Sequence, residues 1–219
     1  MDLYLNEKNA IDFSSTRNSN WVGWENIFKH IHNLPNIKIL DLGCGNGRFI
    51  SWLELKEINI TSYLGIDYSN ILLDIAKKKF GSKVFQFKKC NFLSMNWGDL
   101  IISCQFDLIV AFGITHHLET EDSRVNFFKN IYAHLSPNGI AVVSFWQFDK
   151  LNVMKTAKYI APNLYSLSFG KSSTRICYLY SIDEISKLLN DFIIVENYLA
   201  DAKNNIGNNY FVLKKNNTK

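Results

Sequence analysis

Short apolar runs alternate along the chain with longer segments whose apolar residues recur at helical spacing. IKILDL (37–42) is apolar almost throughout, which is typical of a strand buried on both faces of a sheet. The next segment, NGRFISWLELKEI (46–58), repeats apolar residues as one face of a helix does. Because such strands and helices alternate, the pattern predicts a doubly wound, mostly parallel α/β sheet with helices on both faces.

The same reasoning predicts seven strands and five helices. Strands are expected at 37–42, 62–67, 82–87, 106–112, 139–146, 192–199 and 209–215, and helices at 24–34, 46–58, 69–80, 122–135 and 181–190. Ser69 has the position and chemistry of an N-cap. The last two strands are close enough in sequence to pair antiparallel, as a hairpin at one edge of the seven-stranded sheet. From Gln147 to Thr174 the pattern assigns no element.

Composition predicts one folded domain over residues 1–219. The chain is 47% hydrophobic and 20% charged, and its net charge of +4 is only mildly basic. No segment approaches the roughly eighteen apolar residues of a membrane span, and acids stand where a secretion signal would be basic. The single cysteines have no spacing that would form a zinc site: Cys44, Cys90, Cys104 and Cys177. We therefore expect a cytoplasmic protein without bound metal, binding neither membrane nor DNA.

A glycine-rich turn follows the first predicted strand. Gly43, Gly45 and Gly47 let the backbone approach a ligand without a Cβ clash, and the helix that follows offers free N–H groups. Arg48 stands where a GxGxxG dinucleotide fingerprint would have its last glycine. Asp41, just before the turn, suits a ligand with positive charge better than a pyrophosphate.

A second acid ends the next strand. Asp67 closes YLGID, a position from which a carboxylate can accept hydrogen bonds from both hydroxyls of a ribose. S-adenosylmethionine combines a ribose with an ammonium and a sulfonium, and we predict it as the cofactor. Glycines at such turns and acids at strand ends also occur without this ligand, but Asp41, the glycines and Asp67 in register favour it.

Residues 37–146 resemble the class I S-adenosylmethionine-dependent methyltransferases. DLGCGNG and GID are similar to the first two motifs of that superfamily, and FDLIVAFGITHHL and LSPNGIAVVSF to its fourth- and fifth-strand motifs. The resemblance implies a methyltransferase enzyme with a Rossmann-like fold. In the third motif many relatives carry an Asp for the adenine amino group, where this chain has Asn91, whose amide oxygen can accept the same bond beside the backbone of Phe92.

Segments outside these motifs resemble the eukaryotic-type tRNA methyltransferases that esterify 5-carboxymethyluridine at the wobble position. The segments are FSSTRNSNW, THHLETEDSRVNFF, SFWQF, RICYLYSIDEISKLL and NNYFVLKK. The resemblance implies a tRNA partner and a small zinc-binding activator subunit. It also implies acceptor-side or tRNA-contacting roles for Arg17, His116, Arg124, Trp146, Arg175 and Asn209. The chain departs from this family at Asn18 and at Ile176 to Tyr178.

The expected chemistry limits the roles of these residues. Methyl transfer from a sulfonium is an in-line displacement, and a carboxylate acceptor with a pKa of about 4 needs no general base at neutral pH. His116 and His117 would then position the acceptor, whereas for a phenol, hydroxyl or amine one of them could act as a base. The arginines could bind phosphates or the carboxylate, or lie in ordinary surface or structural positions. Trp146 could stack on a base or belong to the core.

These expectations divide the domain into three parts. Residues 1–35 would cover the site, 36–146 would bind the cofactor, and 147–219 would supply the acceptor side and the C-terminal hairpin. The leading hypothesis is carboxyl methylation of a tRNA wobble uridine. The alternatives are a small-molecule O- or N-methyltransferase and a non-catalytic adapter of the same fold.

Overall fold

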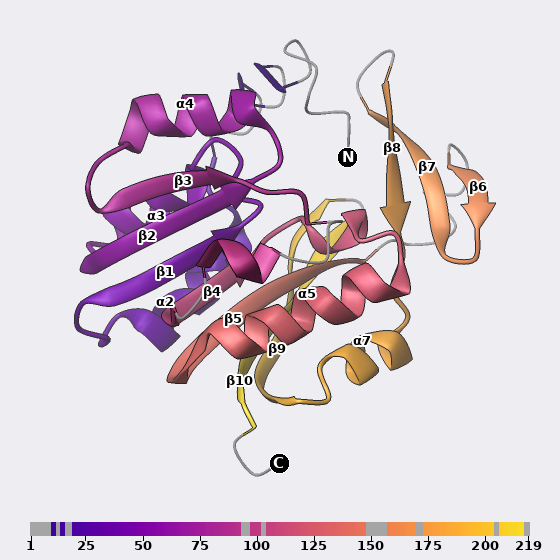
Figure 1. Ribbon diagram of the computed structural model, residues 1–219. Helices are drawn as coiled ribbons and strands as arrows, with labels where there is room; N and C mark the ends of the chain where they lie inside the picture. The colour runs from indigo at the N-terminus through magenta and orange to yellow at the C-terminus, as the bar shows by residue number, and fades with distance from the viewer. Residues whose placement is uncertain are drawn as a thin grey trace.

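The computed structural model describes residues 10–11, 14–15, 19–92, 97–101, 104–147, 157–169, 173–203 and 206–216. A seven-stranded sheet has the order β3-β2-β1-β4-β5-β10-β9, and a second sheet has the order β6-β7-β8 (Figure 1). The strands of the large sheet are β1 (Ile37–Leu42), β2 (Ile60–Asp67), β3 (Phe85–Lys89), β4 (Phe106–Ala111), β5 (Leu135–Gln147), β9 (Phe192–Lys203) and β10 (Ile206–Lys215). Those of the small sheet are β6 (Lys158–Ala161), β7 (Leu164–Phe169) and β8 (Ser173–Tyr178).

The large sheet confirms the predicted doubly wound, mostly parallel architecture. Strands β3, β2, β1, β4 and β5 pair in parallel. Strand β10 pairs antiparallel with both β5 and β9, which confirms the predicted C-terminal hairpin. Because β10 lies between its two neighbours, β9 forms the edge.

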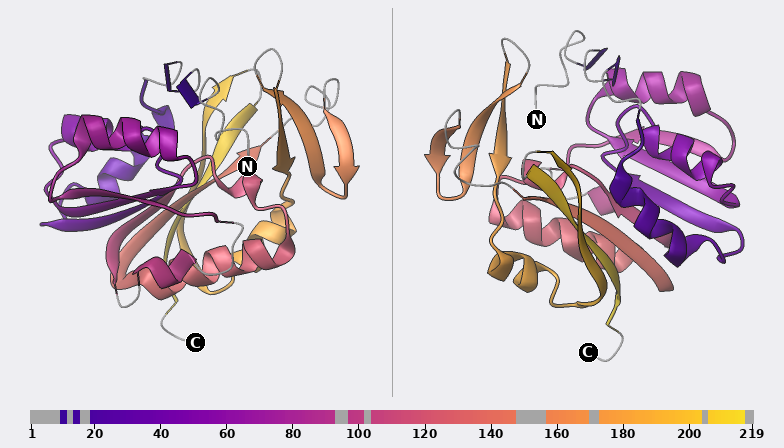
Figure 2. Two further views of the ribbon diagram at one scale, coloured as in Figure 1. Left: turned by 45° about the horizontal axis from the view of Figure 1, so that its top comes forward. Right: turned by 180° about the vertical axis from the view of Figure 1, so that it is seen from behind.

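Helices cover both faces of this sheet (Figure 2). The helical segments are η2 (Val22–Trp24), α2 (Glu25–Ile31), α3 (Arg48–Leu55), α4 (Asn70–Phe80), η3 (Trp97–Ile101), η4 (Thr115–His117), α5 (Glu121–His134) and α7 (Ile182–Leu188). Neighbouring residues of a strand point to opposite faces. Ile39 accordingly packs with the helices α2 and α3, whereas Leu40 packs in a second cluster with α5 and α7. This division explains why IKILDL is apolar almost throughout.

Local signals place several element ends. The Ser69 side chain accepts a hydrogen bond of 3.3 Å from the Leu72 N–H, which confirms the predicted N-cap of α4. The third strand was expected at 82–87 but begins at Phe85, because the Ser82 hydroxyl accepts from the N–H groups of Val84 and Phe85 and forms a turn there. The fifth strand begins at Leu135, before its predicted start at Gly139.

The small antiparallel sheet lies where the sequence pattern assigned no element. Strand β6 is short and largely exposed, and it therefore carries no clear apolar alternation. The sheet stands beside the large one in Figure 2, and its strand β8 contacts η4. Within the ranges given above, no helix has the length and apolar character needed to cross a membrane.

The N-terminal segment is attached to the last two strands. The Gly23 N–H donates to the Asp201 carboxylate over 3.1 Å, and the Tyr198 hydroxyl donates to the Gly23 carbonyl over 2.8 Å. The Tyr210 hydroxyl donates to the same Asp201 carboxylate. These bonds hold Trp24 and its neighbours against the sheet, although the two segments lie at opposite ends of the chain.

Gly23→Ala is expected to destabilise this attachment. A Cβ at Gly23 would lie 2.4 Å from the Tyr210 ring, which is fully buried and held by its hydroxyl, so the ring cannot move away freely. Overpacking of this kind typically costs about 1–3 kcal/mol, or several degrees in Tm. Thermal melting compared with Val22→Ala, at a side chain that is 73% exposed, tests this. Equal melting of the two variants would contradict the packing described.

Candidate functional site

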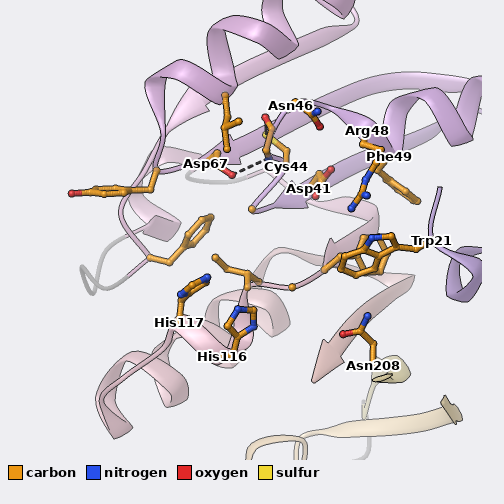
Figure 3. A pocket seen from close by; sticks show the side chains of 18 of the residues that line it. Trp21, Asp41, Cys44, Asn46, Arg48, Phe49, Asp67, His116, His117 and Asn208 are labelled. Carbon is orange, nitrogen blue, oxygen red and sulfur yellow. Dashed lines mark hydrogen bonds between the residues drawn. The ribbon is translucent and has the colours of Figure 1, made fainter. Parts of the chain in front are cut away.

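A cavity opens at the carboxyl ends of the parallel strands, where such folds bind their ligands (Figure 3). It is bounded by the glycine turn, η4, the end of β5 and the N-terminal segment. The residues that line it are Trp21, Trp24, Asp41, Gly43, Cys44, Gly45, Asn46, Arg48, Phe49, Asp67, Tyr68, Leu72, Phe92, Phe112, Gly113, Ile114, His116, His117, Trp146, Arg175 and Asn208. Nine of the predicted site residues line this cavity: Asp41, Gly43, Gly45, Asp67, Phe92, His116, His117, Trp146 and Arg175. A tenth, Gly47, closes the glycine turn that borders it.

The glycine turn uses backbone conformations that other residues adopt rarely. Gly47 has a φ of 78° and caps α3, and a Cβ there would lie 2.9 Å from the Phe80 ring. Gly43 has a φ of 79°, and its N–H donates to the Ile66 carbonyl over 2.7 Å. The turn is thus held against the end of β2, with its backbone bordering the cavity.

Asp41 is a buried acid at the end of β1. Its side chain is 3% exposed and accepts a hydrogen bond from the Tyr63 hydroxyl. Burial raises the pKa of Asp41 to about 7, while the Tyr63 bond and the Arg48 charge act in the opposite direction. A cation arriving beside this carboxyl group would favour its ionised form.

Asp67 is held in place by the backbone of two turns. One carboxylate oxygen accepts from the Gly45 N–H and the other from the Ser69 N–H, each over 2.9 Å. Burial raises the pKa of Asp67. Because each carboxylate oxygen can accept a second bond, the group can still bind neighbouring hydroxyls of a ligand.

The far end of the cavity carries a column of stacked side chains. The Arg175 guanidinium lies 4.1 Å from the centre of the Trp146 ring, which stacks on His116 at 4.3 Å and 26°. His116 and His117 lie 4.2 Å apart, ring centre to ring centre. Figure 3 shows the two histidines across the cavity from Asp41 and Asp67.

Both histidines are neutral at physiological pH. Burial lowers the pKa of His117 to about 3 and holds the pKa of His116 well below its ordinary value. His116 is 4% exposed, and neither of its ring nitrogens has a hydrogen-bond partner among the described groups. It can therefore still donate or accept one bond to a ligand.

Besides Gly47, three described site residues predicted from the sequence do not line the cavity: Arg124, Asn91 and Asn209. Arg124 lies over the Tyr178 ring at 3.7 Å, donates to the carbonyls of Leu118 and Glu119, and borders a separate cavity between α5 and α7. Asn91 follows β3, but its neighbour Phe92 reaches the wall instead. Arg17 lies outside the described residues.

Asn209 accepts a hydrogen bond of 2.5 Å from Asn197 on β9. The preceding residue, Asn208, lines the cavity in its place, because neighbouring residues of a strand face opposite sides. The sequence reasoning therefore chose the right strand and the wrong one of two adjacent asparagines as a lining residue.

Other lining residues were not predicted from the sequence as parts of the site. Arg48 lies 5.1 Å from the Trp21 ring and 5.4 Å from the Trp24 ring, and donates to the Ser19 carbonyl over 3.2 Å. Tyr68 follows Asp67 at the end of β2. The only sequence signal was their proximity to Asp67 and the glycine turn, since the docking of the N-terminal segment is a tertiary feature.

Comparison with known proteins supports one interpretation of this cavity. Residues 40–141 match a protein family that is described as a methyltransferase domain. The tRNA (carboxymethyluridine(34)-5-O)-methyltransferase of Mus musculus is 29% identical over 153 residues, which are 69% of this chain and 20% of the mouse protein. The ubiquinone biosynthesis O-methyltransferase of Rickettsia canadensis (strain McKiel) is 29% identical over 134 residues, which are 61% of this chain and 50% of that protein.

A solved structure shares the fold over almost the whole chain. The S-adenosylmethionine-dependent methyltransferase from Clostridium acetobutylicum ATCC 824 superposes with a TM-score of 0.67 and 18% identity, covering 92% of this chain and 94% of that one. The fold, the glycine turn with its two acids and these similarities support a class I S-adenosylmethionine-dependent methyltransferase domain with S-adenosylmethionine as its cofactor. The chain spans about a fifth of the length of the mouse protein and about half of the length of the Rickettsia protein.

The ionisation of Asp41 is expected to lower the stability of the ligand-free protein as pH rises. Its folded-state pKa of about 7 lies above the unfolded value of 3.8, so the folded state holds the extra proton between these two pH values. The free energy of unfolding therefore falls from about pH 4 to pH 7, by up to about 4 kcal/mol. Asp41→Asn should melt higher than wild type at pH 8, with the difference shrinking toward pH 5. Asp74→Asn, at an exposed acid, controls for net charge. Parallel pH profiles of wild type and Asp41→Asn would overturn this account.

Proposed function

We propose that the domain methylates a carboxylate on tRNA, namely the side chain of a 5-carboxymethyluridine at the wobble position. The observation that carries the proposal is the division of charge within the cavity. Among the described lining residues, the carboxylates of Asp41 and Asp67 outnumber the Arg48 guanidinium at the glycine turn, whereas Arg175 and two neutral histidines form the far end. The first end suits a cationic cofactor, and the second suits an anionic acceptor.

The cofactor would be held by the glycine-turn end. In this proposal Asp67 accepts the ribose hydroxyls, Asp41 lies near the positive charge of the amino-acid part, and the backbone of Gly43, Gly45 and Gly47 borders the ligand. Phe92 contacts the adenine, with Asn91 as a further candidate. S-adenosylmethionine supplies an electrophilic methyl group bonded to a sulfonium. The residues fit this group because the carboxyl oxygens of both acids can accept further hydrogen bonds beyond those that the protein donates to them.

The two histidines match an acceptor that needs no deprotonation. An imidazole with a pKa of about 3, as for His117, is a poor general base at neutral pH, and burial weakens His116 in the same direction. A carboxylate with a pKa of about 4 is already ionised and nucleophilic. The neutral rings would then orient the acceptor and exclude water from the site.

Arg175 is the candidate partner of the acceptor carboxylate. A guanidinium can bind a carboxylate through two parallel hydrogen bonds, and its planar group is oriented here by stacking on Trp146. Because the Trp146 ring contacts both Arg175 and His116, we propose that it holds these two groups in place. A tRNA substrate is further supported by the similarity to the mouse tRNA methyltransferase. The zinc-binding activator subunit and the cytoplasmic location stay predictions.

The second candidate function is O-methylation of a small molecule. It is favoured by the similarity to the ubiquinone biosynthesis O-methyltransferase. A phenol acceptor would have to lose its proton near neutrality, and the two histidines at the far end of the cavity are weak bases for this step.

Cofactor binding is tested first by thermal melting. S-adenosylhomocysteine at a hundred times its Kd should stabilise the protein by about 2.7 kcal/mol, whereas NAD should not. Asp67→Ala should lose most of this shift, because the proposed hydroxyl bonds are removed. Asp74→Ala, at an exposed acid of α4, should retain it. A larger shift with NAD, or an undiminished shift in Asp67→Ala, would contradict the proposed binding mode.

The acceptor is tested by the pH dependence of the chemical step and by the product. In single turnover with saturating enzyme, methylation of tRNA carrying 5-carboxymethyluridine should be nearly independent of pH from about 6 to 8.5, because the acceptor is ionised throughout. Mild alkali should release the methyl group, as expected for an ester. Methyl incorporation into a metabolite extract but not into tRNA, or an alkali-stable product, would favour the small-molecule enzyme instead.

A further inference from the structure

We infer that Asn208 selects the base of the acceptor by accepting a hydrogen bond from a ring N–H, and that Asp201 positions it for this role. The inference rests on the proposed function and adds a specificity-determining residue to the same cavity. This hydrogen bond would distinguish a uracil ring, which has an N–H at position 3, from a cytosine ring, which has a lone pair there.

Asn208 is placed in the cavity by strand register. It is 6% exposed, lines the cavity and pairs with Trp146 across the antiparallel β5 and β10. Directly paired residues share a face of the sheet, with Cβ atoms about 5 Å apart. Since Trp146 stacks on His116 and carries the Arg175 guanidinium, Asn208 lies beside the end of the cavity that would hold the acceptor.

The orientation of the Asn208 amide follows from its contact with Asp201. Its Nδ2 donates to Asp201 Oδ2 over 3.3 Å, and the same carboxylate accepts from the Tyr210 hydroxyl and the Gly23 N–H. A carboxylate that receives these bonds acts as an acceptor, so it attracts the amino side of the amide. The carbonyl oxygen of Asn208 is left to the cavity, and in Figure 3 it lies on the side of His116.

The far end of the cavity therefore combines a cation with an oriented acceptor. Arg175 matches a carboxylate or a carbonyl oxygen of a ligand, and the Asn208 oxygen matches an N–H donor. The uracil of 5-carboxymethyluridine has both features, because its N–H lies between two carbonyl groups. A cytosine with the same carboxymethyl group would bring a lone pair against the Asn208 oxygen and leave both acceptors without a donor.

Methylation of two matched anticodon stem-loops tests this role. They carry either 5-carboxymethyluridine or 5-carboxymethylcytidine at the same position, so that the methyl-accepting carboxylate is identical. Wild type should prefer the uridine substrate in kcat/KM by about tenfold or more. Asn208→Ala should raise KM for the uridine substrate and bring the preference close to one, while the melting shift with S-adenosylhomocysteine stays unchanged.

Asp201→Asn provides a second variant that keeps Asn208. An asparagine tolerates the positive φ of 58° at this position, and its amino group can donate to the Asn208 oxygen and reverse the amide. The uridine preference should then fall, although residue 201 contacts Asn208 and not the ligand itself. Asn197→Ala, on the exposed edge strand, is the matched control and should keep the preference.

The outcomes separate this inference from the function on which it rests. Absence of methylation of both stem-loops by wild type would reject the proposed tRNA function. Methylation of both with equal efficiency, or an undiminished uridine preference in Asn208→Ala and Asp201→Asn, would overturn the role of Asn208 while leaving the carboxyl methyltransferase in place.

Discussion

The parallel pairing of β1 with β2 and β4 is the constraint on which the rest of the site depends. Asp41 lies beside Gly65 on one neighbouring strand and Val110 on the other. Since parallel strands all end at the same edge of the sheet, the turns that follow them meet there. This geometry gathers the glycine turn, Asp67 and the histidines of η4 around one cavity, although they are far apart in the sequence.

The opposite wall of the cavity is built by both ends of the chain. Asp201 accepts bonds from Gly23 in the N-terminal segment and from Asn208 and Tyr210 on β10. It adopts a positive φ of 58°, which aspartate tolerates better than most residues. One carboxylate thereby joins the segment that carries Trp21 and Trp24 to the strand that carries Asn208. The position of the tryptophans over Arg48 depends on this connection.

Burial acts in opposite directions at the two ends of the cavity. It raises the pKa of the acids at the glycine turn and lowers the pKa of the histidines near Arg175, because the charged form of each group is disfavoured away from water. In the ligand-free protein the charged forms of these acids and histidines are therefore less populated than they would be in water. A cationic cofactor would restore the charge of Asp41, whereas the histidines stay neutral and leave Arg175 as the cationic group of the end proposed to hold the acceptor. In the proposed function, this difference would separate the cofactor from the acceptor within a single cavity.

The sequence by itself determined the alternation of strands and helices along the chain, the Ser69 cap, and the placement of Asp41, Asp67, His116 and His117 at the ends of strands. These features depend on local periodicity, on turn chemistry, and on the rule that parallel strands open at one edge. Only the tertiary structure decided that Asn208 faces the cavity rather than Asn209, that Phe92 rather than Asn91 forms the wall, and that Arg124 binds loop carbonyls away from the cavity. The tertiary structure also showed the small sheet, whose strand β8 brings Arg175 to Trp146. The physical reason is that these outcomes depend on strand register and on the docking of distant segments, and a change of one residue in register turns a side chain to the other face.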